Sequence, residues 1–555
     1  MRASIVWLCA FGCASPTTGP GSEPDPKGWN ITVDMSRLDR FVTAPSWRVG
    51  GVATATEGLA GVDVNGSAAA VATDGAFSTD VSITAGLVPV PVLARDLVGH
   101  ERKGDRTLIA TAFLPEGALA PQSAALVVSN TTLSAMSAGL TSQTGNVDVA
   151  GEIMSKDTLS QDDRCVTWPT GARQGTVQVS LAQDQSGLVL RIVIPNLDVY
   201  FAGECQGLLS TIPLAGEMHA TIVVQTRLTA LPPADGGCLS AFAHTTPTVS
   251  VQNWYFDVWG TAGPLQDWIV SMFRDQKSAE ARAQLATEVG TRADQLLAEK
   301  LASISVFERT SELTLLDRPI AMQLCLTALD AIGGRLVARV GAATTGAGTR
   351  EAPGAPQIDG ALPAVAPNEL VLDANLVAQL LFSAWRDGGF ARTAPDVDVG
   401  VLQVLMPGLY ERHPDATSAQ VAIDGELPPL VRATPSGPGD LRVELGDLMV
   451  TVSVEGERIL TFGVNLELEL ALEPTMGGLA PKVLDSRATV ALLDELLDGA
   501  DAALEQAVQV QIGGSAAQLI GNGTVLALPD LPGLGAPSDV TADAGGRYVR
   551  VKLSP

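Results

Sequence analysis

The chain has few aromatic and few charged residues for its length. Of 555 residues, aromatics make up 4% and Asp, Glu, Lys and Arg together 17%, whereas apolar residues make up 46%. This balance excludes a largely disordered chain and predicts several domains with sizeable cores. Basic residues are scarce as well, 35 against 61 acidic ones, which leaves a formal net charge of -26. A surface of that sign repels phosphate, so nucleic acid is not an expected partner.

Motifs of enzymes and metal sites are also missing. The sequence contains no HExxH, GxSxG, P-loop or GxGxxG pattern, so a non-enzymatic protein is favoured. The four histidines fall in separate predicted segments and no two cysteines form a CxxC pair. Neither a metal nor a cofactor is therefore expected. A hydrolase whose site is assembled only in space stays open as an alternative.

The first residues have the pattern of an export signal. Residues 1–12 combine Arg2 with a short apolar run, and "AFGC" resembles a bacterial lipobox that would make Cys13 the lipidated first residue. Residues 13–37 are rich in Pro and Gly, as a tether should be. We expect a lipoprotein anchored in the bacterial cell envelope, on the outer membrane, with simple secretion as the alternative. No later segment has eighteen uninterrupted apolar residues, so no spanning helix is expected.

Export permits disulfides among the cysteines that remain after residue 12 other than Cys13. These are Cys165, Cys205, Cys238 and Cys325, which allow three connectivities. We favour Cys165 with Cys205, and Cys238 with Cys325.

Residues 38–112 predict a helix-free unit of short strands. Apolar residues alternate with polar ones, and Asn65-Gly66 and Asp74-Gly75 are hairpin turn signals. A β-sandwich of immunoglobulin type is expected. The stretch also resembles the bacterial immunoglobulin-like modules of surface proteins, which usually act as spacers.

The remaining chain predicts two similar parts on either side of a Gly/Pro-rich linker at 341–369. The first part, 115–340, contains strands and a long amphipathic helix from Pro264 to about Leu301. The second part, 370–555, opens with a helix that Asp373 caps and Gly388-Gly389 closes. In its strands, Leu466, Leu468 and Leu470 alternate with glutamates, which predicts a sheet with one wet face. A closing helix is expected over 488–512.

Three stretches resemble the family of bactericidal/permeability-increasing, lipopolysaccharide-binding and lipid-transfer proteins, which share the tubular lipid-binding fold. They are "GPLQDWIVSMFRDQKSAEARAQLATEVGTRADQLLAEKL" after the strand "VSVQNWYFDVWG", "LVLDANLVAQLLFSAWRDGGF", and the tail "VLALPDLPGLGAPSDVTADAGGRYVRVKL". The resemblance implies an α+β fold with two tandem tubular halves, 115–340 and 370–555, behind the N-terminal β-sandwich. In that family each half wraps a long helix in a bent antiparallel sheet, and an apolar groove accepts acyl chains.

The resemblance implies a non-enzymatic lipid-binding protein, possibly one that transfers lipid, with the groove lined by apolar side chains of the helices. The candidate lipid-binding residues are Trp268, Met272, Phe273, Leu376, Leu380, Leu381, Trp385, Leu493 and Leu497. The alternative is a surface scaffold or adhesin whose grooves are filled. The bactericidal members hold lipid phosphates with a basic tip, whereas the only basic cluster here, Arg95 to Arg106, lies in the sandwich module. Killing through lipopolysaccharide is therefore not expected.

Trp385 allows two interpretations. It stands one helical turn after Leu381 and three residues before Gly388, so its indole lies near a helix end. It would either sit at the mouth of the second groove, with its N–H available to water or a headgroup, or seal the core, where its N–H needs a protein partner.

Overall fold

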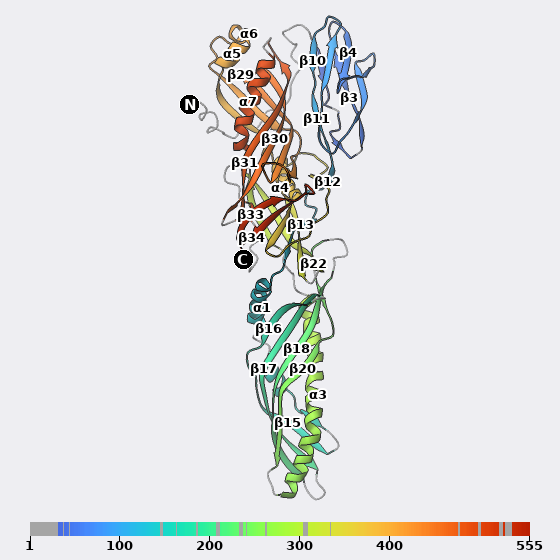
Figure 1. Ribbon diagram of the computed structural model, residues 1–555, viewed down its shortest axis with the longest axis vertical. Helices are drawn as coiled ribbons and strands as arrows, with labels where there is room; N and C mark the ends of the chain where they lie inside the picture. Colours follow the sequence, from blue (N-terminus) through green and yellow to red (C-terminus); the bar gives the residue numbers. More distant parts are fainter. Residues whose placement is uncertain are drawn as a thin grey trace.

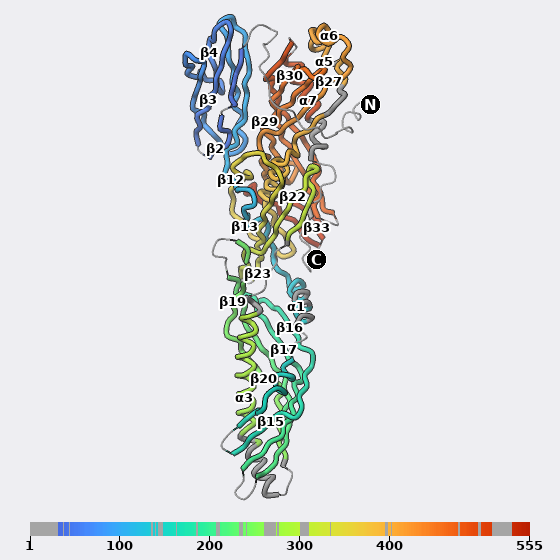
Figure 2. The backbone as a smooth tube through the Cα atoms, turned by 180° about the vertical axis from the view of Figure 1, so that it is seen from behind, coloured from blue at the N-terminus to red at the C-terminus, as the bar shows by residue number. Residues whose placement is uncertain are grey.

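The computed structural model describes residues 31–554 except 37, 44, 145–147, 162–163, 185–186, 207–210, 232–236, 240, 261–263, 303–308, 333–334, 476–477, 498–500, 521–525 and 528–535. The molecule is elongated and rich in strands. Helix α3 and its sheet form one end, a central sheet lies in the middle, and a third large sheet stands beside the N-terminal module at the other end (Figures 1 and 2). The predicted signal segment, Cys13 and most of the predicted tether lie outside the described residues.

The described part of the N-terminal module contains strands and no helix. Asn65 and Gly66, both with positive φ, form the turn between β4 and β5, as the Asn-Gly signal predicts. Its three small sheets enclose one apolar cluster that includes Val49, Val62 and Leu108. The strands are β1 (Thr32–Asp34), β2 (Phe41–Val42), β3 (Ser46–Thr54), β4 (Leu59–Val64), β5 (Ser67–Ala68), β6 (Ala70–Val71), β7 (Ala76–Ser82), β8 (Gly86–Val90), β9 (Val92–Asp96), β10 (Glu101–Lys103) and β11 (Arg106–Ala110).

The lower sheet has the order β14-β15-β17-β18-β19, with β16 also paired to β17 and β20 to β18. Helix α3 (Pro264–Ala302) runs along it, over the range that the apolar periodicity predicts (Figure 1). The other helices here are α1 (Asn130–Thr144) and α2 (Val149–Met154). The strands are β14 (Ser160–Gln161), β15 (Cys165–Arg173), β16 (Gln178–Asp184), β17 (Gly187–Gln206), β18 (Thr211–Ala230), β19 (Phe242–His244) and β20 (Thr248–Gly260).

The central sheet takes strands from both predicted halves, which therefore share a sheet. Its order is β21-β22-β23-β13-β25-β34-β33, and helix α4 (Ala374–Arg386) packs on it. The strands are β13 (Ala120–Val127), β21 (Arg309–Leu315), β22 (Arg318–Ile332), β23 (Arg335–Thr345), β25 (Glu369–Asp373), β33 (Pro537–Ala542) and β34 (Tyr548–Leu553); β12 (Ala112–Leu114) pairs separately with β24 (Ala355–Gln357).

The upper sheet has the order β26-β27-β29-β30-β31-β32, with β28 paired to β29. Leu466, Leu468 and Leu470 of β30 are buried in the core, as the alternation predicts. The predicted wet face is only partly present, because Glu467 is part-exposed but Glu469 is buried and pairs with Arg442. The strands are β26 (Arg392–Asp398), β27 (Ser418–Gly425), β28 (Leu430–Ala433), β29 (Leu441–Val454), β30 (Glu457–Thr475), β31 (Gly478–Glu495) and β32 (Leu526–Ala527); the helices are α5 (Gly400–Leu405), α6 (Pro407–Arg412) and α7 (Asp501–Ile520).

The prediction of a closing helix over 488–512 is wrong in its first part. Residues up to Glu495 belong to strand β31, and helix α7 begins at Asp501. Leu492 pairs with Phe462 and Asp494 with Thr461, so Leu493 is an extra residue in the strand. Because of this bulge, Leu492 and Leu493 are both buried, and two adjacent buried leucines break the alternation that reveals a strand in a sequence.

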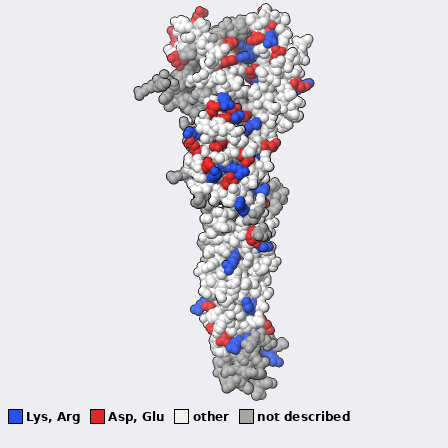
Figure 3. All heavy atoms as spheres, viewed as in Figure 1, with Lys and Arg blue, Asp and Glu red and all other residues white. Residues whose placement is uncertain are grey.

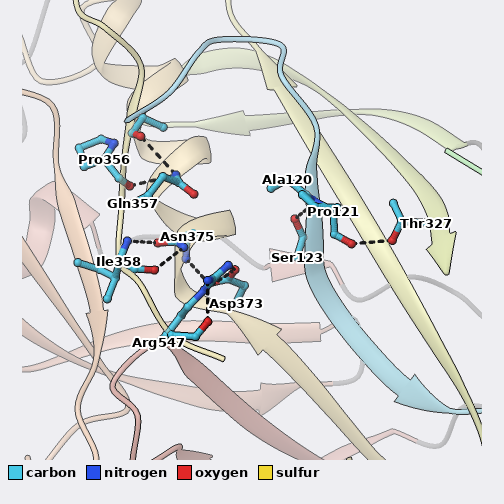
Figure 4. Close-up of polar contacts among 12 residues, drawn as sticks. Ala120, Pro121, Ser123, Thr327, Pro356, Gln357, Ile358, Asp373, Asn375 and Arg547 are labelled. Atoms are coloured by element: carbon cyan, nitrogen blue, oxygen red, sulfur yellow. Dashed lines mark hydrogen bonds and ion pairs between the residues drawn. The ribbon is translucent and has the colours of Figure 1, made fainter. Parts of the chain in front are cut away.

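The prediction that 341–369 is a free linker is also wrong. Part of it belongs to β23 and β24. The side-chain amide of Asn375 in α4 accepts from the backbone N–H of Ile358 at 2.8 Å and donates to its carbonyl at 3.0 Å (Figure 4). Its glycines permit close approach: a Cβ at Gly348 would lie 2.0 Å from the backbone carbon of Arg386. The composition that suggested flexibility therefore serves tight packing against α4.

Both predicted disulfides are present. Cys165 pairs with Cys205 across adjacent strands of the lower sheet, and Cys238 pairs with Cys325 of β22 in the central sheet. The second bond ties the loop after β18 to the central sheet.

Asp373 joins helix α4 to the C-terminal strands. Its carboxylate accepts from the backbone N–H of Asn375 as the predicted cap, and Arg547 donates to it at 2.6 Å (Figure 4). The side chain of Asp373 is 1% exposed. We predict that Asp373→Ala, which leaves Arg547 without its partner, lowers the free energy of unfolding by about 3–5 kcal/mol, as measured by urea denaturation.

The matched control is Asp539→Ala on β33. Asp539 pairs with Lys552 in the same C-terminal strand pair, but both side chains are more than half exposed. Its loss should cost no more than about 1 kcal/mol. Equal destabilisation by the two variants would contradict a special role for the Asp373–Arg547 pair.

Candidate apolar ligand site

The inner face of the lower sheet, defined as the face toward α3, carries a row of aromatic rings. Because side chains alternate along a strand, Trp254 and Phe256 of β20 share this face with Val258. The rings of Trp254 and Phe256 stack at 6.0 Å, and Phe256 stacks on Phe201 of β17 at 5.6 Å. Cross-strand ring pairs of this kind stabilise a sheet and present a broad apolar surface.

Helix α3 is held to the edge of the sheet that contains β19 and β20. The indole N–H of Trp254 donates to Ser278 at 3.0 Å, and Arg282 donates to the carbonyl of Val251 at 2.6 Å. His244 of β19 contacts Asp294 at 3.0 Å. These contacts fix the middle of the helix along one edge of the sheet.

The same helix also contacts the segment beside the opposite edge. Lys156, which follows α2, forms an ion pair with Glu288 of α3. Gln284 donates to the carbonyl of Leu159, next to β14, at 3.4 Å. Helix α3 therefore contacts both edges of the lower sheet.

Several apolar residues of the inner face keep part of their surface exposed. Met218, Trp254 and Phe256 pack against the buried cluster around Ile222 and Leu285 or its neighbour around Phe201, but none of the three is itself buried. On α4, by contrast, eleven of thirteen residues are buried. The described inner face is thus less completely covered than the core of the central region.

The opposite face of the same strands carries a polar contact across three of them. Asp198 of β17 accepts from Arg173 of β15 and contacts His219 of β18, each at 2.5 Å. Burial alone would raise the pKa of Asp198, but the hydrogen bonds from His219 and Arg173 outweigh it and hold the pKa below its ordinary value. The sheet is therefore apolar toward α3 and held by charge on its outer side.

The structure separates the residues that the sequence proposed for the site. Trp268, Met272 and Phe273 lie on α3, but their side chains fall outside the described residues. Leu376, Leu380 and Leu381 are buried in the large core around α4. Leu493 lies on strand β31, and Leu497 lies before α7, so neither belongs to a helix.

Trp385 follows the second interpretation. Its side chain is 2% exposed, and its indole N–H donates to the carbonyl of Gly425 at 2.7 Å. Phe382 stacks on it, and the guanidinium of Arg350 lies 5.7 Å from its ring. Trp385 seals the core and does not stand at the mouth of a groove.

The aromatic row on the inner face was not among the residues proposed from the sequence. Trp254, Phe256 and Val258 stand two residues apart in "VQNWYFDVWG", which is the strand period. That alternation could have identified them. The contribution of Phe201 could not have been found, because its contact with Phe256 depends on the pairing of β17, β18 and β20.

The basic cluster of the module is used for internal docking. Arg102 forms an ion pair with Asp494 of β31, and Lys103 donates to Glu505 of α7 at 2.7 Å. The same Glu505 accepts from the backbone N–H of Leu492 at 2.8 Å. The module is thereby connected to the seam between β31 and α7.

A second set of contacts joins the module to the upper sheet. Arg40 contacts Glu426 at 2.7 Å and the buried Asp447 at 2.8 Å. Thr107 donates to Asn465 at 2.8 Å. These contacts dock the module on the upper sheet. A module docked in this way differs from the spacers that similar modules usually form.

Two hollows formed by described residues are largely polar. One, of about 400 Å³, lies on the outer face of the upper sheet and is lined by residues that include Arg432, Arg442 and Glu469. The other, of about 120 Å³, lies between the module and β31. The described residues contain no group of three or more His, Cys, Asp or Glu side chains placed to hold a metal. None of the described helices is long and apolar enough to cross a membrane.

Comparison with known proteins gives a family match for part of the chain and several remote structural likenesses, two of which follow. Residues 46–112 match the family model described as glucodextranase, domain B. A crystal structure of lipopolysaccharide binding protein aligns at 11% identity with a TM-score of 0.38, covering 79% of this chain and 99% of that one. The structure of P47 of Clostridium botulinum E1 aligns at 10% identity with a TM-score of 0.28, covering 79% and 100%. TM-scores this low assign neither a fold nor a ligand. A comparison with curated protein sequences gives no match.

The docking contacts make a prediction about the module. We expect the double variant Arg102→Ala/Lys103→Ala to loosen the module from the upper sheet, because both cations pair with carboxylates across the boundary. Small-angle scattering should then give a larger radius of gyration than for the unaltered protein, and 1 M salt should shift the unaltered protein in the same direction. Arg48→Ala is the control, since Arg48 pairs with Asp80 inside the module and both are well exposed. Unchanged scattering for the double variant would show that the other contacts, including those of Arg40, Thr107 and Arg432, are enough to fix the module.

Proposed function

We propose that the protein binds lipid non-enzymatically, with acyl chains between the lower sheet and α3. The observation that carries this proposal is the contact of one helix with both edges of the lower sheet. Five strands lie side by side in that sheet, which at the usual spacing is about 20 Å across. A helix with its side chains is about 10 Å wide. A sheet that curves toward the helix would allow contacts at both of its edges, and a curved sheet around one helix is the arrangement of a tube, which supports the proposal.

The inner face suits an apolar ligand. Met218, Trp254 and Phe256 remain partly exposed there although they belong to the apolar side of the sheet. Burying acyl carbons against such residues yields about 0.8 kcal/mol per CH₂, so a chain of about sixteen carbons could gain on the order of 10 kcal/mol before ordering costs. The described inner face presents apolar side chains and no cluster of basic residues, which favours weak selection among headgroups.

The setting that fits this activity is the bacterial envelope. The lipobox-like sequence at Cys13 supports a lipid anchor, and the lack of recognisable catalytic motifs supports a binding protein rather than an enzyme. The alternative, a surface scaffold, is favoured by the tight core around α4 and by the docked module. The two functions differ in one respect: only the first requires uptake of a lipid.

Uptake of a pyrene-labelled fatty acid by the full chain tests the proposal. We expect saturable binding, and we expect Met218→Glu to weaken it at least tenfold, because the substitution places a carboxylate on the inner face. Ala202→Glu is the control: Ala202 lies on the outer side of β17 and is part-exposed, as Met218 is, so binding should be unchanged. Circular dichroism of each variant checks that the sheet is intact.

Two results would contradict the proposal. Absence of saturable binding by the unaltered protein would favour the scaffold. Equal weakening by Met218→Glu and Ala202→Glu would show that the ligand does not lie on the inner face of the lower sheet.

A further inference from the structure

The most exposed apolar side chains gather at one end of the molecule. Among large apolar residues in the described part of the chain, five are more than 60% exposed. Four of them stand on elements at the upper end in Figure 1, either in the turn between β9 and β10 or on α5 and α6. They are Leu97 (70%), Val98 (64%), Val404 (79%) and Tyr410 (61%). They form two pairs, one on the module and one on α5 and α6, and exposed apolar pairs at the same end of a molecule suit contact with an extended apolar surface.

The turn that presents Leu97 and Val98 has a fixed shape. The buried carboxylate of Asp96 accepts from the backbone N–H groups of Val98 and His100, at 3.0 and 2.8 Å, and contacts the His100 ring at 2.7 Å. Gly99 supplies the positive φ that closes the turn. The hydrogen bonds within this turn therefore hold two adjacent apolar side chains in solvent. Their exposure costs free energy unless another surface covers them.

Ion pairs connect this turn to the helices on the far side of the same end. Arg102 of β10 pairs with Asp494, which also accepts from Arg458 at 3.0 Å. Next to Arg458, Glu457 accepts from Arg412 of α6 at 2.8 Å. A series of ion pairs thus links strand β10, which follows the module turn, to helix α6.

The first described residue lies at this end as well. Ile31 lines the hollow between the module and β31 together with Arg102 and Leu493. Thr32 pairs with Thr54, whose strand leads to the turn at Gly58, and Leu97 donates to the carbonyl of Gly58 at 2.9 Å. The seventeen residues 14–30 separate Ile31 from Cys13, and a chain of that length reaches at most about 60 Å.

We propose that this upper end rests on an uncharged phospholipid surface, with Leu97, Val98, Val404 and Tyr410 placed among the headgroups. The inference rests on the proposed envelope function, because a lipid on Cys13 would hold this end, rather than the α3 end, near the bilayer. Apolar side chains with a Tyr hydroxyl suit the boundary between headgroups and acyl chains. The net charge of -26 selects against an anionic lipid surface.

Vesicle flotation of the full chain carrying Cys13→Ser tests the contact without the anchor. We expect binding to phosphatidylcholine vesicles, and weaker binding when phosphatidylglycerol is added. Leu97→Ser/Val98→Ser and Val404→Ser/Tyr410→Ser should each weaken binding at least tenfold. Val510→Ser is the matched control, since Val510 is 70% exposed but lies in the middle of α7, and it should leave binding unchanged.

Uptake of the pyrene-labelled fatty acid by the same variants separates this proposal from the proposed function. If the surface variants still take up the fatty acid but no longer float with the vesicles, the membrane contact is supported. If they float as before but no longer take up the fatty acid, the substituted residues serve the lipid site and not the membrane contact. No flotation of the Cys13→Ser protein, or equal flotation of all variants, would overturn the membrane contact. So would loss of self-association in the Leu97 and Val98 variant with flotation unaltered, which would assign the surface to a second protein copy.

Discussion

The burial of eleven of the thirteen residues of helix α4 holds the parts of the molecule together. Strands from both predicted halves and the C-terminal strands meet in the sheet on which this helix packs, so its apolar side chains need cover from all of them. Asp373 fixes its start to Arg547, and Asn375 fixes the segment at Ile358 (Figure 4). The glycines at 346 and 348 let the chain pass close to its far end. This explains why a strongly acidic protein contains so apolar a helix: α4 forms part of the core that the strands of the central sheet share.

The apolar side chains of the lower sheet are less completely covered than those around α4. Helix α3 runs along its inner face, and α2 adds Ala150 and Ile153 to the same apolar cluster. Contacts at both edges of the sheet keep α3 in place. The rings of Phe201, Trp254 and Phe256 lie on this face, two of them part-exposed. In Figure 3 the charged residues are scattered over the described lower part of the visible face, whereas Lys, Arg, Asp and Glu are mixed densely over its middle part. The core that joins the chain and the surface proposed for lipid are therefore separate.

The sequence predicted the elements whose signals are local. The 3.6-residue period located α3, and Asp373 and the Gly388-Gly389 pair located the ends of α4, where Gly388 has a positive φ. The alternation at Leu466, Leu468 and Leu470 located a strand. The predictions failed where the same sequence pattern can arise from two different structures. The Gly/Pro-rich stretch 341–369 was predicted to be a linker, but Gly346 and Gly348 pack closely against α4. The bulge at Leu493 gave a strand the pattern of a helix.

The candidate site was less predictable than the fold, because it depends on which strands pair. Trp254 and Phe256 were visible as an alternating pair, but nothing local indicates that Phe201 joins them or that Trp385 finds a partner at Gly425. The ion pairs of Arg102 and Lys103 with the upper sheet join residues about four hundred positions apart and change the role of the module from spacer to docked part.

Native mass spectrometry of the full chain, purified without detergent from its producing cells, tests the central claim most directly. The account predicts a protein peak accompanied by species whose added mass corresponds to one or more lipids and disappears on collisional activation. A single peak at the mass of the unliganded protein, unchanged after incubation with phospholipid, would contradict it.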